Sequence, residues 1–326
     1  MQAPACINEM TARSSLSLKS SLKKHPPKND SDKYSLSLLE THCSMLERKI
    51  TMKKQADYIK RIEIKGIWGR KNIAWELRPD VNILSGINGI GKSTIVNQSV
   101  HSLDLLSGGE LDCDTIPENV RFEFFPSDAS YIRFDVIRSF DRPLVNVGLM
   151  QKVADEHVRT ELDWQLYRLQ RRYLDYQVNI GNRIIELLTG GSPDGQSQAA
   201  RVSVPKTRFQ DMIDSLFRET GKKINRKSNE ILIEQDGELL NPYQLSSGEK
   251  QILVILLTVL VQDEQPCALF MDEPEISLHI EWQQQLIKLI RELNPHVQII
   301  LTTHSPAVIM DGWLDAVTEV SDITES

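Results

Sequence analysis

One eight-residue segment limits the folds open to this 326-residue chain: Gly86-Ile87-Asn88-Gly89-Ile90-Gly91-Lys92-Ser93. It fits the pattern G-x-x-x-x-G-K-[ST] in full and lies between the apolar run 81–84 and a helical pattern. Glycines let backbone N–H groups curl around a polyphosphate, and a following helix directs its positive N-terminal end at the anion. We predict that Gly86 to Thr94 bind a nucleotide, with Lys92 on the β- and γ-phosphates and the Ser93 hydroxyl on Mg²⁺. The alternative is an accidental glycine-rich turn.

A second segment, about 180 residues later, complements the first. Residues 267–271 form a buried-strand pattern that ends in Asp272-Glu273-Pro274. Alone, an apolar strand followed by two carboxylates is common and indicates only a solvated strand end. Paired with a phosphate loop, it predicts that Asp272 holds the metal ion through water and that Glu273 polarises the attacking water.

Two further segments carry candidate binding groups. Leu245-Ser246-Ser247-Gly248-Glu249 precedes a long apolar helix, so its hydroxyls and free N–H groups offer an anion site, although taken alone the segment is better explained as an ordinary helix cap. The predicted strand 298–301 ends in Thr302-Thr303-His304-Ser305-Pro306. We predict that His304 contacts a phosphate; the alternative is a partly buried structural histidine.

Composition excludes several classes of protein. Hydrophobic residues make up 40% and charged residues 25%, as in soluble globular proteins, and a net charge of −7 argues against a bulk nucleic-acid binder. The longest apolar run, 252–261, is about half of the ~20 residues that a membrane-spanning helix needs, and we expect no membrane contact. No secretory signal is evident, so we expect a cytoplasmic protein with reduced thiols. A zinc site is not expected, because the cysteines lack any C-x-x-C pair: Cys6, Cys43, Cys113 and Cys267.

Texture along the chain predicts four regions. Residues 1–56 are Ser-rich and basic and are predicted to be disordered, and Met52 is an alternative start. Residues 57–150 should form the first part of the nucleotide-binding domain, 151–228 a helical insert, and 229–326 the second part. Within the first part we predict strands near 59–67, 73–77 and 81–84, and an antiparallel hairpin of 120–125 with 131–137.

The insert is predicted from a change of period. Apolar residues spaced by three and four predict a helix of roughly 35 residues over 152–188, followed by a polar loop after Pro193. A second helix should span 206–220 and end at Gly221. A hairpin around Asp236-Gly237 should then lead into the second half of a parallel sheet.

Together, in this order, the four motifs resemble those of ABC-type ATPases, and more closely the soluble branch that includes RecF-, SMC- and OLD-like proteins. The resemblance covers about residues 57–318. It implies a P-loop NTPase head with a parallel core sheet, an antiparallel β subdomain and a helical insert. In such a family Leu245–Glu249 is the signature, Asp272-Glu273 the Walker B pair, residues 274–279 the D-loop and His304 the switch histidine.

The family's mechanism implies that two heads form a homodimer around two ATP molecules. Ser247 and Gly248 of one head would then face the γ-phosphate held by Lys92 of the other, with Ser246 and Glu249 as further nucleotide-binding candidates. Ser247 and Glu249 depart from the usual Leu-Ser-Gly-Gly-Gln but are variants associated with the soluble branch. The Q-loop glutamine is not obvious: the matching region 139–143 has none, and Asp141 or Gln151 are the alternatives.

The family context narrows the role. Transporter motors usually read Asp-Glu-Pro-Thr and Thr-His-Asp, unlike this chain, and SMC proteins carry hundreds of residues where about 150 separate loop and signature here. Because twenty residues follow Pro306 in this sequence, we expect no Toprim nuclease of the OLD-like kind and expect any nuclease activity to come from a partner. We expect an ATP-driven switch in DNA repair or anti-phage defence, acting on a separate effector protein; the alternative is a nucleotide-binding scaffold with little turnover.

Basic side chains of the insert suggest DNA as a further partner. Phosphate backbones bind mostly through electrostatics. A charge run is, however, more often a solvated face, and acidic neighbours dilute the charge of the long helix. The candidate groups are Arg168, Arg171, Arg172, Arg183 and the cluster 222–227.

Overall fold

The computed structural model describes residues 54–107, 119–138, 157–191 and 193–325. Several sequence predictions lie outside the described residues: the N-terminal region up to residue 53 with its alternative start at Met52, the Q-loop candidates Asp141 and Gln151, and three of the four cysteines. Among the helices that are described, none is long and apolar enough to cross a membrane.

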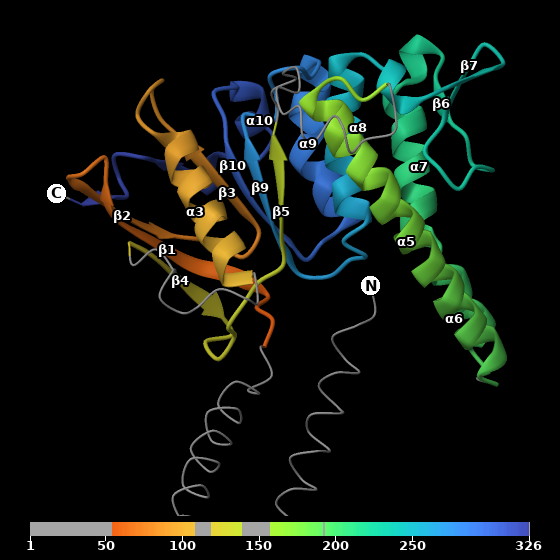
Figure 1. The fold of residues 1–326 in the computed structure, drawn as a ribbon, viewed down its shortest axis with the longest axis horizontal. Helices are drawn as coiled ribbons and strands as arrows, with labels where there is room; N and C mark the ends of the chain where they lie inside the picture. The colour runs from red at the N-terminus through yellow and green to blue at the C-terminus, as the bar shows by residue number, and fades with distance from the viewer. Residues whose placement is uncertain (1–53, 108–118, 139–156, 192, 326) are drawn as a thin grey trace, which may run out of the picture. The chain divides into compact units, whose positions relative to one another are not determined.

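A five-stranded sheet, parallel throughout, forms the centre of the described chain (Figure 1). Its strand order is β11-β3-β10-β9-β5, so β10 separates the strand that leads into the phosphate loop from the strand that ends at Asp272. The strands span β3 Val81–Ser85, β5 Phe134–Arg138, β9 Cys267–Asp272, β10 Val297–Thr302 and β11 Val317–Glu319. The prediction of a parallel core sheet is confirmed.

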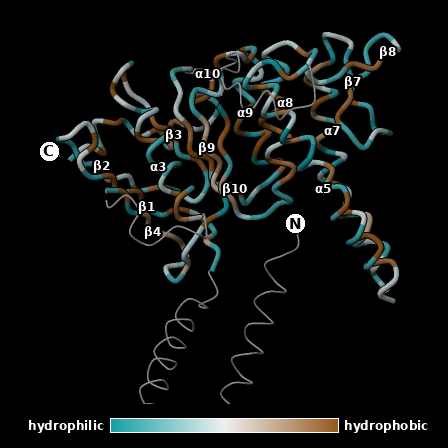
Figure 2. Tube along the Cα trace, viewed as in Figure 1, coloured by the Kyte–Doolittle hydropathy of each residue, from teal (hydrophilic) through white to brown (hydrophobic). Residues whose placement is uncertain are grey.

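The two faces of this sheet pack against different elements. Leu269 and Met271 of β9 join one hydrophobic cluster with helices α8 and α9, whereas Ala268 and Phe270 join another with helix α3. This alternation follows from the two-residue period of a strand, and because both faces are covered, β9 is apolar from Cys267 to Met271. Figure 2 shows the hydrophobic strands at the centre. The helices span α3 Lys92–Ser107, α8 Ser247–Leu260, α9 Ile280–Leu293 and α10 Pro306–Met310.

A four-stranded antiparallel sheet lies on the α3 side, with the order β12-β2-β1-β4. The strands are β1 Tyr58–Ile67, β2 Lys71–Glu76, β4 Val120–Phe125 and β12 Thr324–Glu325. The predicted hairpin of 120–125 with 131–137 is wrong. β4 pairs with β1, whereas β5 pairs in parallel with β9 in the other sheet. Alternating hydrophobicity identifies a strand but does not identify its partner.

The insert is largely helical, as predicted, with two differences in detail. α5 (Glu161–Thr189) begins at Glu161 because Thr160 caps it, accepting from the Asp163 N–H while the Asp163 carboxylate accepts from the Thr160 N–H. Where a loop was predicted after Pro193, the chain forms α6 (Gly195–Val202). This helix packs on α5, and its Ala199 is buried.

The second insert helix is α7 (Val204–Leu216), continued by the 3₁₀ turn η1 (Arg218–Thr220). It stops at Gly221, whose φ of 68° is the left-handed conformation favoured by glycine. The predicted hairpin is confirmed: β7 (Ile233–Gln235) and β8 (Glu238–Leu240) flank Asp236-Gly237 and form a small sheet with β6 (Lys223–Ile224). Short 3₁₀ turns η2 (Pro242–Gln244) and η3 (Leu314–Ala316) complete the described elements.

Candidate functional site

The candidate site lies at the carboxyl edge of the parallel sheet, where β3, β9 and β10 end side by side. Asp272 is the last residue of β9, and its carboxylate is contacted by one side chain that follows β3 and one that ends β10. Its Oδ1 accepts from the Ser93 hydroxyl at 2.9 Å and from the Thr302 hydroxyl at 2.5 Å. Two predicted metal-site residues that are 179 positions apart are thus brought together.

The phosphate loop, residues 86–93, follows β3 directly. Gly86, Gly89 and Gly91 have φ values of 148°, 79° and 105°, which side-chain-bearing residues rarely adopt. The Lys92 ammonium turns back over the loop and donates to the carbonyl oxygens of Gly86 at 3.0 Å and Ile87 at 3.4 Å. The lysine side chain therefore lies along the concave side of the loop, where a polyphosphate would be cradled.

Trp68, between β1 and β2, was missed by the sequence reasoning. A Cβ added to Gly91 would come within 1.8 Å of its indole Cζ2, so the ring lies directly against the phosphate loop. Trp68 is 47% exposed and has a left-handed φ of 51°. An exposed indole beside the predicted phosphate loop is a flat apolar surface on which a base could stack. Only the turn glycines Gly66 and Gly69 around it gave a sequence signal.

Glu273 and His304 face each other at the ends of neighbouring strands. His304 Nε2 lies 3.4 Å from Glu273 Oε1, and both side chains are partly exposed. The Glu273 N–H donates to both the carbonyl and the hydroxyl oxygen of Thr302, and Glu273 has a left-handed φ of 47°. A strained non-glycine backbone that is held by hydrogen bonds is a feature of functional sites.

Glu275 is a second residue that sequence reasoning did not single out. It is only 6% exposed, and its Oε1 accepts from the Thr303 hydroxyl at 2.5 Å and from the His304 N–H at 3.0 Å. The carboxylate therefore fixes the backbone of His304, the predicted switch histidine. The sequence signal that could have identified this residue is a glutamate at the position where transporter motors have threonine.

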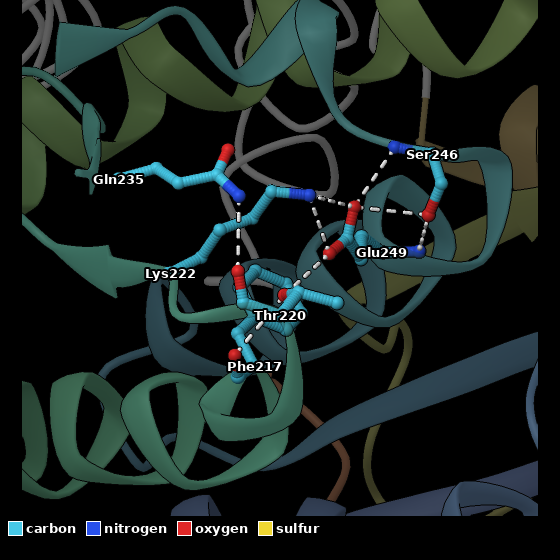
Figure 3. Close-up of polar contacts among 6 residues, drawn as sticks. All are labelled: Phe217, Thr220, Lys222, Gln235, Ser246 and Glu249. Atoms are coloured by element: carbon cyan, nitrogen blue, oxygen red, sulfur yellow. Dashed lines mark hydrogen bonds and ion pairs between the residues drawn. The ribbon is translucent and has the colours of Figure 1, made fainter. Parts of the chain in front are cut away.

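The signature segment lies at the start of α8 and forms a helix cap, which was the alternative interpretation of this segment. Ser246 is the N-cap: its hydroxyl accepts from the Glu249 N–H, and its own N–H and hydroxyl donate to Glu249 Oε2, each at 2.9 Å. Figure 3 shows that the same carboxylate also accepts from Lys222 Nζ at 2.8 and 2.9 Å and from the Thr220 hydroxyl at 3.2 Å. Burial works to raise the pKa of Glu249, but these hydrogen bonds and the Lys222 charge outweigh it and lower that pKa.

Gly248, between Ser246 and Glu249 in the signature segment, lies against Ser277 of the predicted D-loop. A Cβ built on Gly248 would come within 2.5 Å of the Ser277 carbonyl oxygen, a distance that real Cβ atoms do not show. Glycine is therefore required here by close packing of two backbones, because its φ is not left-handed. The structure thus joins the signature to the D-loop within one chain, while Glu249 faces the insert.

Four of the eight candidate basic groups of the insert are paired with carboxylates. Arg172 pairs with Asp135, Arg183 with Asp263 and Lys222 with Glu249. Arg226 bridges Asp211 and Asp214, at 2.7 and 2.6 Å. The charges of these four groups are therefore balanced within the chain, which removes them from the argument for DNA binding by this face.

Fold and motif order define the class: a P-loop ATPase of the ABC type, with the segments predicted as phosphate loop, signature, Walker B strand and switch histidine in that order along the chain. Residues 117–311, more than half of the chain, match the family described as "AAA domain, putative AbiEii toxin, Type IV TA system". The chain belongs to that family. The matched range contains the signature, Asp272 and His304, whereas the phosphate loop lies before it.

Curated relatives agree with this class. The chain is 24% identical to the Septu protein PtuA of Bacillus thuringiensis over 77% of this chain and 72% of that protein. It is 31% identical to the retron Ec83 probable ATPase of Escherichia coli over 26% of this chain and 18% of that one. It is 24% identical to the retron Vc95 probable ATPase of Vibrio cholerae over 48% of this chain and 32% of that protein. The chain therefore spans less than a third of each retron ATPase.

Among solved structures, the chain is similar to an SMC head bound to the C-terminal winged-helix domain of ScpA. The TM-score is 0.42 and the identity 15%, over 78% of this chain and 91% of that one.

Proposed function

We propose that this protein is a Mg²⁺-dependent ATPase whose heads dimerise around ATP and act as a switch on a separate effector in anti-phage defence. The observation that carries the proposal is the contact of Ser93 with Asp272, which joins the phosphate loop to the Walker B strand. The Septu and retron names of the relatives favour a defence role over the other expected role, DNA repair.

The site residues fit a magnesium ion. A hydroxyl and a carboxylate oxygen 2.9 Å apart are the hard oxygen ligands that Mg²⁺ prefers, and the phosphates would supply more. Bound Mg²⁺ would neutralise charge on the transferred phosphoryl group. Ser93 would bind the ion directly and Asp272 through water, while Lys92 would leave the Gly86 carbonyl for the β- and γ-phosphates.

Glu273 is proposed as the general base. Its carboxylate lies beyond Asp272 on the same edge, where it can accept a proton from water that attacks the γ-phosphate. His304, 3.4 Å from Glu273 Oε1, would orient that carboxylate and contact the phosphate. In the dimer, Ser247 and Gly248 of the partner head would complete the site, as the resemblance implies.

The test compares ATP binding, turnover and ATP-dependent dimerisation in four proteins. Lys92→Ala should lose ATP binding, and Glu273→Gln should bind ATP, dimerise and not hydrolyse it. Glu281→Gln, the same change at an exposed position of α9, should behave as wild type. Wild-type turnover no faster than that of Glu273→Gln would refute the assignment of the base. It would instead favour the scaffold alternative if complex formation proved independent of ATP.

A further inference from the structure

A buried ion pair joins the insert to the signature. Glu249 is the third residue of α8 and is 4% exposed, and the side chain of its partner Lys222 is 14% exposed. Lys222 lies between Gly221, which ends η1, and β6, so it belongs to the insert. The pair therefore spans two structural units that meet at the residues expected to face the partner's γ-phosphate.

The insert side of this pair is firmly held (Figure 3). The Lys222 N–H donates to the Phe217 carbonyl at 3.3 Å, and Gln235 Nε2 donates to the Thr220 carbonyl at 3.0 Å. Phe217 itself is fully buried, with its ring 6.0 Å from that of Trp282 on α9. The position of Lys222 is therefore set by the end of α7 and by the small sheet.

The signature side depends on the same carboxylate. Glu249 Oε2 accepts from the N–H and the hydroxyl of Ser246, which fixes the turn that presents Ser247 and Gly248. A buried carboxylate that loses its cation must move toward water or take up a proton. Either change weakens the bonds to Ser246, so displacement of Lys222 is transmitted to the signature turn.

We propose that Lys222 is a positioning residue for the signature, through which the position of the insert controls ATP-dependent dimerisation. This inference rests on the proposed function, because the signature acts only when a second head brings its bound ATP. It gives the insert a regulatory role, since a partner that shifts the end of α7 would change the signature without touching nucleotide. The phosphate loop of the same head is built from other elements, so nucleotide binding by a single head should not depend on Lys222.

The experiment uses the full chain in the Glu273→Gln background and measures ATP affinity, ATP-dependent dimerisation and melting temperature. Lys222→Met should weaken dimerisation at least tenfold and leave ATP affinity within about twofold. Lys222→Met/Glu249→Gln should recover most of the dimerisation, because the glutamine retains an acceptor for Ser246 without an uncompensated charge. Lys222→Arg should also retain it.

Arg172→Met is the matched control, because it breaks another ion pair between the insert and the core, with Asp135, away from the signature. It should lower the melting temperature and leave dimerisation intact. Equal loss of dimerisation in Arg172→Met and Lys222→Met would show a merely structural role and overturn the inference, as would normal dimerisation of Lys222→Met. Failure of the Glu273→Gln parent to dimerise with ATP would instead refute the proposed function, and the inference with it.

Discussion

Replacing Gly248 by alanine tests the close packing of the signature against the D-loop. In a helix, Gly→Ala ordinarily stabilises by up to about 1 kcal/mol. Here the new Cβ would lie 2.5 Å from the Ser277 carbonyl oxygen, and real Cβ atoms stay beyond 3.0 Å, so one backbone must move by at least 0.5 Å. Overpacking of this kind costs about 1–3 kcal/mol. We expect Gly248→Ala to be destabilising despite the gain in helix propensity.

Gly181 provides the matched comparison. It lies inside α5, and a Cβ at this position meets nothing within 4 Å among the described residues. Gly181→Ala should therefore stabilise by about 1 kcal/mol, through the lower conformational entropy of the unfolded chain. The two variants should differ by about 1–3 kcal/mol and straddle the wild type.

Urea denaturation followed by circular dichroism gives both free energies, and thermal melting checks their order, at roughly 2 °C or more per kcal/mol. Stabilisation of Gly248→Ala equal to that of Gly181→Ala would refute the packing argument, because it would show that Ser277 yields at no cost.

Two further predictions concern buried carboxylates. Glu275→Ala should slow ATP turnover about tenfold or more, because it leaves the Thr303 hydroxyl and the His304 N–H without an acceptor, at roughly 1–3 kcal/mol each. Glu275→Gln keeps an acceptor oxygen and should retain most activity. Equal turnover of the two variants in steady-state assays would contradict this prediction. The pKa of folded Glu249 is lowered from its ordinary value of 4.5, so as the pH falls below about 4.5 the unfolded chain takes up this proton first and stability declines. Urea titrations at about pH 6 and about pH 3 should therefore show a larger loss for wild type than for Lys222→Met/Glu249→Gln, and equal losses would count against the ion pair.

The sequence predicted the fold well where local pattern and burial coincide. Residues 267–271 of β9 and 252–257 of α8 are apolar on all sides because both elements are enclosed, and every residue from Glu249 to Leu260 is buried. Pairing was harder to predict. β4 and β5 are adjacent in sequence and both alternate, yet they belong to different sheets, since alternation carries no information about the neighbouring strand. α6 was missed because Gly, Ser and Gln favour loops, while its stability comes from packing on α5.

The candidate site shows the same division. Lys92, Ser93 and Asp272 follow from motifs whose residue types are dictated by phosphate and metal chemistry. Thr302, Glu275 and Lys222 act through hydrogen bonds to those or neighbouring residues, over separations of 27 to 30 positions. Threonine, glutamate and lysine are common in any chain, so only the folded geometry distinguishes these three from their neighbours.

The order of strands in the central sheet has a consequence for synthesis. β3, which leads into the phosphate loop, is hydrogen-bonded on one side to β10 and on the other to β11, both more than 200 residues further along. During translation β3 therefore emerges long before either neighbour, and loop closure over that distance makes such pairing slow. Nucleotide binding therefore cannot stabilise the N-terminal half of the nascent chain by itself. A chain that ends before residue 297 has the phosphate loop but lacks both strands that flank β3.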